Sequence, residues 1–363
     1  MKNTFGNAVT LTLFGESHGS AIGAVLDGLS SGIKIDEQFI KDKLSLRRPS
    51  GDISTKRVEA DEFEILSGVF NGYTTGTPLC IVIKNTNTKS KDYSEVSRLM
   101  RPSHADLTAY YRYGGYEDYR GGGHFSGRIT AALVAACSVL QYALEQKGIF
   151  IGTHIKSLAT INDRKFADLK EDIDALSRLV FPVLSEESAE KMKQEIVDAS
   201  KQLDSVGGIL ETAVIGLPAG IGEPWFDTVE GLISHAVFSV PGVKGIEFGA
   251  GFDITKMRGS FANDQLEIKD EAIISKTNHS GGINGGITNG MPIIFRTAVK
   301  PTPSIFKAQQ TVDIKSMQNA TLELKGRHDP AIVHRARAVV DAVTALTIAD
   351  MLTVSFGNSF LGE

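Results

Sequence analysis

Residues 127–148, GRITAALVAACSVLQYALEQKG, decide the fold of this chain. Small and apolar side chains occupy nearly every face of the helix that this stretch predicts, and Gly148 is placed to end it. A helix that is apolar all round must be covered by other elements on both sides. We therefore expect this helix to lie inside the core of a folded domain.

The segments around this helix alternate between strand patterns and helices. Strongly strand-like stretches on both sides of it indicate an α+β or layered α/β sandwich, and no linker or repeat divides the chain, so we expect one domain over residues 1–363. A last long helix is expected to open at Asp329-Pro330 and to run to about Leu352. The predicted strands cover residues 7–13, 62–70, 77–85, 208–220, 244–253 and 291–299.

Residues 160–203 differ from the rest of the chain because they carry most of the helical charge. Ser185, followed by two glutamates, is a suitable helix start, since acidic side chains favour the positive end of the helix dipole. We expect this stretch to be a solvated helical excursion from the core, with no chemistry in it.

Composition narrows the class of protein. Hydrophobic residues make up 42% and charged residues 22% of the 363 residues, and the net charge of −5 argues against nucleic-acid binding. Cys80 and Cys137 lie in apolar runs and are expected to be buried thiols. No signal-peptide pattern and no run of 18 apolar residues occurs, so we expect a cytoplasmic protein that does not bind a membrane.

The motif GESHG at residues 15–19 carries the first candidate histidine, His18. It also satisfies the G-x-S-x-G pattern of a hydrolase, with Ser17 as the nucleophile. That pattern needs a helix after the serine, whereas the following AIGAVLDG is strand-like. A third alternative is that His18 is only a turn residue.

The motif RPSHAD at residues 101–106 carries a second candidate histidine, His104, three residues after Arg101. Downstream, three glycines at 121–123 precede the apolar helix and could present backbone N–H groups to an anion. Arginine provides a rigid fork for phosphate and carboxylate groups, so these residues together indicate an anion-binding enzyme with two proton carriers.

Three further motifs lie late in the chain: NHSGGINGGITNG (278–290), VKPTPSI (299–305) and GRHDP (326–330). None forms a phosphate-binding P-loop or a dinucleotide-binding fingerprint, and no metal-ligand pattern occurs, so we expect no metal. Asp329 of GRHDP has a structural alternative to catalysis, because aspartate before proline is a common helix N-cap.

Taken in order, these motifs resemble those of the chorismate synthase family, from residue 5 to about residue 350, with only the charged excursion unmatched. The most specific are GESHG, RPSHAD, the GGG…SGR stretch and GRHDP. The resemblance implies a layered β-α-β sandwich, with core helices between two antiparallel sheets, assembled as a homotetramer. It implies conversion of 5-enolpyruvylshikimate-3-phosphate to chorismate by 1,4-elimination of phosphate, with reduced FMN and no net redox change.

The resemblance also implies roles for individual residues. His18 matches the histidine that protonates reduced flavin, His104 the one that protonates the departing phosphate, and Asp329 the aspartate near flavin N5. Arg47 matches an arginine that binds NADPH in some members. The implied substrate-binding residues are Ser17, Arg48, Arg57, Arg101, Arg128 and Arg327. The implied flavin-binding residues are His124, Phe125, Ser126, Gly286, Lys300, Pro301, Thr302, Pro303, Ser304 and Arg327, with Pro241 and Gly242 matched more loosely.

The chain departs from the family pattern in a few places. Members commonly have an arginine at His124 and a glycine at Ser103. The chain is short for the type that reduces its own flavin, so we expect an external flavin reductase and no use of NADPH. The alternatives to this enzyme are the serine hydrolase already described and a protein that only binds flavin.

Overall fold

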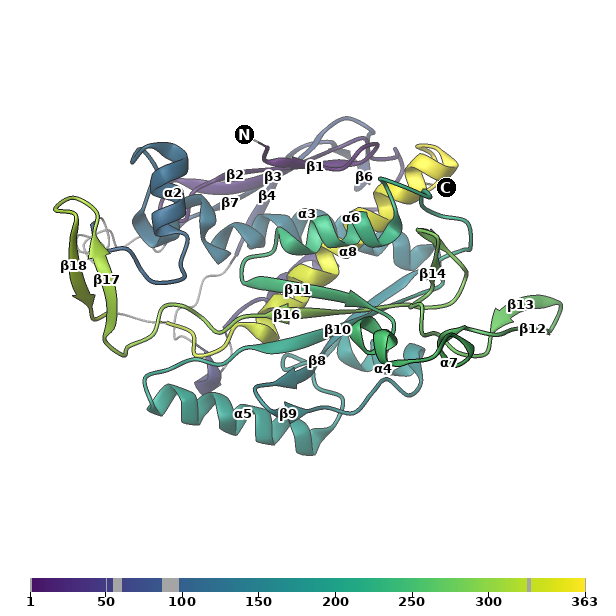
Figure 1. The fold of residues 1–363 in the computed structure, drawn as a ribbon. Helices are drawn as coiled ribbons and strands as arrows, with labels where there is room; N and C mark the ends of the chain where they lie inside the picture. Colours follow the sequence, from purple (N-terminus) through teal and green to yellow (C-terminus); the bar gives the residue numbers. More distant parts are fainter. Residues whose placement is uncertain (1, 50, 55–60, 87–97, 325–327, 363) are drawn as a thin grey trace.

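The computed structural model describes residues 2–49, 51–54, 61–86, 98–324 and 328–362. Two five-stranded antiparallel sheets enclose a layer of helices, and two more helices lie outside the second sheet (Figure 1). This arrangement confirms the α+β sandwich that the resemblance implied.

The first sheet comes from the N-terminal part of the chain and has the strand order β1-β2-β3-β7-β4. Alternate apolar side chains of its central strands, such as Ile22 and Ile81, are fully buried, so one face of the sheet covers the helix layer. Its strands are β1 (Thr4–Phe5), β2 (Thr10–Gly15), β3 (Ala21–Asp27), β4 (Phe63–Ser67) and β7 (Leu79–Lys84), and β5 (Val69–Phe70) pairs with β6 (Tyr73–Thr74) beside it.

The middle layer contains α3 (Thr130–Gln146) and α8 (Val333–Phe356), which pack on each other, with α1 (Glu37–Ser45) beside α3 and α6 (Val229–Phe238) beside α8. α3 contacts β3 and β7 of the first sheet, while α8 contacts β8 and β10 of the second. Gly148, at φ +75°, ends α3 as predicted, and the Ile149 N–H donates back to the Leu144 carbonyl.

The helices Gly127–Gln146 and Val333–Phe356 are long and apolar enough to cross a membrane. However, 89% and 83% of their apolar windows are buried inside the fold, so they are core helices. Cys137 of α3 is buried and Cys80 of β7 half-buried; both are free thiols, and burial raises the pKa of each. The sequence predicted two buried thiols. Cys137 is buried as predicted, whereas Cys80 is only half-buried.

The last helix begins later than the sequence predicted. α8 starts at Val333, and its N-cap position is Ile332, which makes no side-chain capping bond. Asp329 is therefore not the cap. Its Oδ2 instead accepts a hydrogen bond of 2.5 Å from Nη1 of Arg335, in the first turn of α8.

The second sheet has the strand order β11-β16-β10-β8-β9. Its strands are β8 (Phe150–Leu158), β9 (Ile161–Asn162), β10 (Gly208–Ile215), β11 (Val243–Phe248) and β16 (Ile293–Val299). The smaller elements of the C-terminal half are β12 (Leu266–Lys269), β13 (Ala272–Ser275), β14 (Ile283–Asn284), β15 (Ile287–Thr288), β17 (Gln309–Asp313), β18 (Gln318–Leu322) and α7 (Gly259–Ala262).

The charged stretch at 160–203 forms α4 (Leu169–Leu176) and α5 (Glu186–Lys201), and Ser185 caps α5 through the Ser188 N–H as predicted. The stretch is not a solvated excursion. Each helix buries an apolar side, with α4 packing on β8 and β10 and α5 on β9. Most of the charges occupy the outer faces of these amphipathic helices, which cover the outside of the second sheet, while Asp172 of α4 is buried and paired with Arg164.

A row of alternating charges crosses the second sheet. His154, Glu211, Arg296 and Glu247 are directly opposite one another on β8, β10, β16 and β11. The His154 ring has no exposed surface; Nδ1 lies 2.9 Å from Asp163 and Nε2 3.2 Å from Glu211. Burial lowers the pKa of His154, but the hydrogen bonds and charges of these two carboxylates outweigh burial and raise it.

His154 should therefore make folding stability depend on pH. Its charged ring stabilises the fold fully below the unfolded pKa of about 6.5, and this contribution is lost as pH rises through the raised folded-state pKa. His154→Gln leaves two carboxylates without their shared cation, which we expect to cost about 3–5 kcal/mol at pH 6. Urea unfolding at pH 6 and pH 9 measures both effects. An unchanged pH dependence in the variant would contradict this assignment.

Candidate active site

The GESHG motif forms the turn between strands β2 and β3. Ser17 and His18 are both buried, and the Ser17 N–H donates to the Gly123 carbonyl at 3.1 Å. Because the motif joins two antiparallel strands, the strand–turn–helix geometry of a hydrolase nucleophile is absent here. The hydrolase alternative is therefore unsupported by the fold.

The glycine turn at 121–123 lies between the two candidate histidines. All three glycines have positive φ, at +58°, +82° and +52°. A Cβ on Gly121 would lie 2.3 Å from Cε1 of His18, and one on Gly122 would lie 3.5 Å from Cε1 of His104. These glycines do not present the first turn of α3 to an anion, since their conformation is not helical and α3 begins only at Thr130.

The RPSHAD motif leads into α2 (Asp106–Tyr113), and its last residue holds the other polar groups in place. Asp106 accepts bonds of 2.7 Å from Nε and from Nη2 of Arg101, and its Oδ1 lies 2.7 Å from Nδ1 of His104. Burial raises the pKa of Asp106, but the hydrogen bonds from Arg101 and His104 outweigh it and hold that pKa far below its usual range.

Ser103 adopts φ +59°. This left-handed conformation is costly for a residue with a Cβ. The Ser103 carbonyl accepts a hydrogen bond of 2.5 Å from Nζ of Lys300. This bond ties the RPSHAD loop to the VKPTPSI segment.

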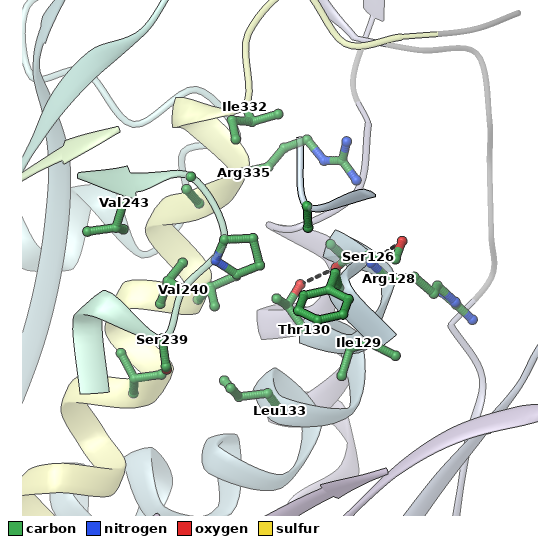
Figure 2. Close-up of a pocket in the computed structure, with 18 of the residues that line it drawn as sticks. Ser126, Arg128, Ile129, Thr130, Leu133, Ser239, Val240, Val243, Ile332 and Arg335 are labelled. Carbon is green, nitrogen blue, oxygen red and sulfur yellow. Dashed lines mark hydrogen bonds between the residues drawn. The ribbon is translucent and has the colours of Figure 1, made fainter. Parts of the chain in front are cut away.

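A cavity of about 980 Å³ lies where the starts of α3 and α8 meet the end of α6. That volume is at the upper end of the usual range of about 300–1,000 Å³ for ligand pockets. Figure 2 shows Leu133 and Thr130 of α3, Val240 after α6, and Ile332 and Arg335 near the start of α8 around this space. Apolar side chains of the core helices thus form much of its wall.

Charged side chains around the cavity are mostly cationic, although the chain as a whole is negative. Such a site favours a ligand with several negative charges. Two aspartates, Asp61 and Asp329, also line it. The lining cations are Lys2, Arg47, Arg48, Arg128, Lys244, Lys300 and Arg335.

Asp61 bridges two of these arginines. Its Oδ2 accepts a bond of 3.0 Å from Nη1 of Arg47, and its Oδ1 bonds Nη1 of Arg128. Arg47 also donates to the Thr130 hydroxyl at 2.9 Å and to the Gly127 carbonyl at 3.2 Å. One carboxylate therefore allows two nearly buried guanidinium groups to stand side by side.

Asp329 also lines the cavity and is paired with Arg335. Arg335 also donates from Nε to the Arg47 carbonyl at 2.8 Å. The neighbouring His328 is largely buried; burial, with the charge of Arg101, lowers its pKa to about 4, so its ring is neutral at physiological pH. His328 therefore adds no charge to the site.

Two of the segments matched to flavin binding, His124 to Ser126 and Lys300 to Ser304, meet at the same cavity. Nδ1 of His124 lies 2.7 Å from the Gly15 carbonyl, and because a carbonyl only accepts, Nδ1 carries the hydrogen. Ser126 caps the turn that starts α3 by accepting from the Arg128 N–H. The predicted residues that line the cavity are Arg47, Arg48, His104, His124, Phe125, Ser126, Arg128, Pro241, Gly242, Lys300, Pro301, Thr302, Pro303, Ser304 and Asp329.

Other predicted residues do not line the cavity. Ser17 and His18 lie under Gly121, which does line it, and Arg101 is turned toward Asp106 and the Ser304 hydroxyl. Gly286 lies at the other end of α6, where its carbonyl accepts from the Val229 N–H. Arg57 and Arg327 lie outside the described residues, and these assignments stay predictions.

Among the residues missed from the sequence are three that form ion pairs with predicted site residues: Asp61, Asp106 and Arg335. Asp106 is part of RPSHAD, so its position two residues after His104 was an available signal. No motif in the sequence around Asp61 or Arg335 indicates that either residue belongs to the site. Their partners, Arg47, Arg128 and Asp329, are brought to them only by the folded chain.

The fold and the cavity define a layered α+β enzyme with a cation-rich site beside paired histidines. The sequence model of the chorismate synthase family matches residues 9–353. The chain is 45% identical over 349 residues to the chorismate synthase of Korarchaeum cryptofilum (strain OPF8), which covers 95% of this chain and 96% of that protein. It is 44% identical over 347 residues to that of Pyrococcus abyssi (strain GE5 / Orsay), with 96% of each covered.

A crystal structure of chorismate synthase matches the fold with a TM-score of 0.77 and 27% sequence identity, over 98% of this chain and 94% of that one. The chain therefore belongs to the chorismate synthase family. It is a carbon–oxygen lyase that acts on phosphates, in the biosynthesis of aromatic compounds.

The Asp61 bridge predicts a stability effect and a binding effect. Asp61→Ala leaves two nearly buried arginines without their common acceptor, so we expect a loss of about 3–5 kcal/mol in unfolding free energy. Because the cavity also loses a negative charge, added inorganic phosphate should raise the melting temperature more in the variant than in the parent. Thermal melts across a phosphate series measure both.

Glu64→Ala is the matched control, since it removes an exposed ion pair with Lys84 and is expected to cost less than about 1 kcal/mol. Equal phosphate responses in the parent and Asp61→Ala would contradict the bridge's electrostatic role.

Proposed function

We propose that this enzyme converts 5-enolpyruvylshikimate-3-phosphate to chorismate and inorganic phosphate by an anti-1,4-elimination, with reduced FMN bound and no net redox change. The observation that carries the proposal is the cavity itself. It holds His104, bonded through Nδ1 to Asp106, together with a group of arginines suited to phosphate. Membership of the chorismate synthase family adds the reaction class.

The arginines bind the substrate in this proposal. The substrate carries a phosphate and two carboxylates, and guanidinium groups can hold each of these through two parallel hydrogen bonds. Arg48 and Arg128 line the cavity, and Arg57, Arg101 and Arg327 are assigned from the resemblance. Holding the substrate at several points orients the C6 hydrogen and the leaving phosphate toward the groups that act on them, which lowers the entropic part of the barrier.

Three side chains handle protons. His104 donates one to the departing phosphate oxygen, which prevents a build-up of charge on the leaving group. His18, which lies beneath Gly121, would hold a proton for a bound flavin, and Asp329 would assist the hydrogen transfer to flavin N5. A histidine suits the first two tasks because its reference pKa of about 6.5 lies near the working pH.

The cavity has the surroundings that a flavin mononucleotide needs. Apolar side chains such as Ile129, Leu133 and Val343 suit a flat ring, and the lining cations suit its phosphate. His124 to Ser126, Lys300 to Ser304, Gly286 and Arg327 would hold it. When bound, reduced flavin would supply electron density that helps to expel phosphate and would accept the hydrogen that leaves the substrate.

The remaining proposals concern supply and assembly. We propose that an external flavin reductase provides the reduced FMN and that NADPH is not used. Arg47, the residue matched to NADPH, is nearly buried and bonded to Asp61 and Thr130. We also propose a cytoplasmic homotetramer; exposed apolar side chains such as Phe226 and Ile268 would suit contacts between copies.

The decisive experiment is an anaerobic assay with photoreduced FMN and 5-enolpyruvylshikimate-3-phosphate. We expect chorismate and phosphate in equal amounts, with no net oxidation of the flavin. Flavin binding without phosphate release would instead support a protein that only binds flavin. Labelling of Ser17 by a serine-directed phosphonate, with loss of an esterase activity, would support the hydrolase.

The two histidines should matter to turnover and not to folding. His104→Ala and His18→Ala each remove a proton donor, so we expect kcat to fall about 10²–10⁴-fold, with little change in the melting temperature. Single-turnover measurement of phosphate release under the same anaerobic conditions tests this. His235→Gln is a control, because His235 also lines the cavity but has no assigned proton. Near-normal rates in both alanine variants would refute the assignment.

A further inference from the structure

We propose that Asp106 is a positioning residue that fixes the tautomer of His104 and aims its Nε2 at the substrate. This inference rests on the proposed function, in which His104 protonates the leaving phosphate. Asp106 lies two residues after His104, at the first position of α2, and its side chain is 7% exposed. His104 itself is 20% exposed and lines the cavity.

The hydrogen bonds to Asp106 give the carboxylate two separate partners. Oδ2 accepts from the backbone N–H of Arg101 at 3.1 Å and from its Nε at 2.7 Å. Oδ1 accepts from Nη2 of Arg101 at 2.7 Å and lies 2.7 Å from Nδ1 of His104. Arginine donates at every nitrogen and cannot accept. Asp106 is therefore held in place as an ionised carboxylate, and both of its oxygens can only accept hydrogen bonds.

This arrangement determines which ring nitrogen of His104 carries the mobile proton. An ionised carboxylate accepts only, so Nδ1 must carry a hydrogen whether the ring is charged or neutral. The proton that leaves in catalysis is then the one on Nε2, and the neutral ring that remains has its hydrogen on Nδ1. The same logic orients the imidazole of serine proteases, where a buried carboxylate sets the tautomer.

Asparagine at position 106 should reverse the tautomer of His104, because an amide offers one donor and one acceptor where the carboxylate offers two acceptors. Its amide has one accepting oxygen and one donating nitrogen. The oxygen is best placed at the Oδ2 position, where two Arg101 N–H groups converge. The amide nitrogen then takes the Oδ1 position, where it loses the bond from Nη2 of Arg101 and faces Nδ1 of His104. A donor at this position requires Nδ1 to be unprotonated, so the neutral ring carries its hydrogen on Nε2. The imidazolium that would donate from Nε2 then has no acceptor for its Nδ1–H, so less of the ring is available as the proton donor.

Asp118 provides a matched control a few residues away. It also accepts from Nε and Nη2 of an arginine, Arg120, at 2.8 Å each, and from the same arginine's backbone N–H at 3.1 Å. No hydrogen bond joins it to His104 among the described residues. Asp118→Asn thus disrupts the same kind of bidentate arginine–aspartate ion pair without removing a hydrogen bond to the His104 ring.

The experiment combines a tautomer measurement with kinetics on the full-length protein. Magic-angle-spinning NMR of protein labelled with [¹⁵N]histidine reports which ring nitrogen is protonated, and His104→Gln assigns the signal. We expect the neutral His104 ring to be protonated on Nδ1 in the parent, in Asp106→Glu and in Asp118→Asn, and on Nε2 in Asp106→Asn. We expect kcat to fall about 10²–10⁴-fold in Asp106→Asn, with KM changed less than about threefold and partial recovery in Asp106→Glu.

The outcomes separate this inference from the proposed function. A parent that forms no chorismate overturns the proposed reaction, and the tautomer, which is read without substrate, still tests the geometry. An active parent whose His104 is protonated on Nε2 overturns the inference, as does Asp106→Asn with parental kcat and an unchanged tautomer. If Asp106→Asn does not fold, the tautomers of the parent and of Asp106→Glu decide the question.

Discussion

The requirement to bury two helices on all sides governs this structure. Of the 24 residues of α8, the first 21 are buried at nearly every position, and α3 is covered almost as completely. Neither helix offers a polar face to water, so one sheet must lie above the layer and another below it. Because both helices are fixed along their length, their N-terminal ends are fixed too. Thr130 at the start of α3 therefore lies across the cavity from Ile332 and Arg335 near the start of α8, while the Arg128 side chain extends away from them to bond Asp61.

How far the sequence predicts the structure depends on the range of the interactions involved. The extent of α3, its end at Gly148 and the Ser185 cap follow from residues close together in the chain, and they were predicted. The start of α8 was not, because Asp329 bonds Arg335 instead of capping the helix. The stretch 160–203 was taken to be solvated because its charges are obvious in the sequence, whereas the buried sides of its two helices are defined only by the sheet that they cover.

The same limit applies to the site. Motifs identify His104, Arg128 and Asp329, since a resemblance transfers residue by residue, and the cavity brings these three together. Motifs do not reveal the partner of each charge. Asp61 lies 14 residues from Arg47 and 67 from Arg128, and only packing selects that combination. Gly286 was matched by motif as well, but in the described chain it lies at the far end of α6 from the cavity.

These carboxylates explain how an anion site can be preformed. A cluster of partly buried arginines repels itself, and removing each from water is costly. Asp61, Asp106 and Asp329 each accept from at least one arginine of the site, so the cations are held in position before any ligand arrives. The arrangement has an energetic consequence. A bound phosphate must compete with the carboxylates for the same N–H groups, so affinity for the anion is reduced while its position is defined. Weaker binding of the anion helps a site that must release phosphate in every turnover. An arginine cluster without carboxylates would bind the released phosphate more tightly.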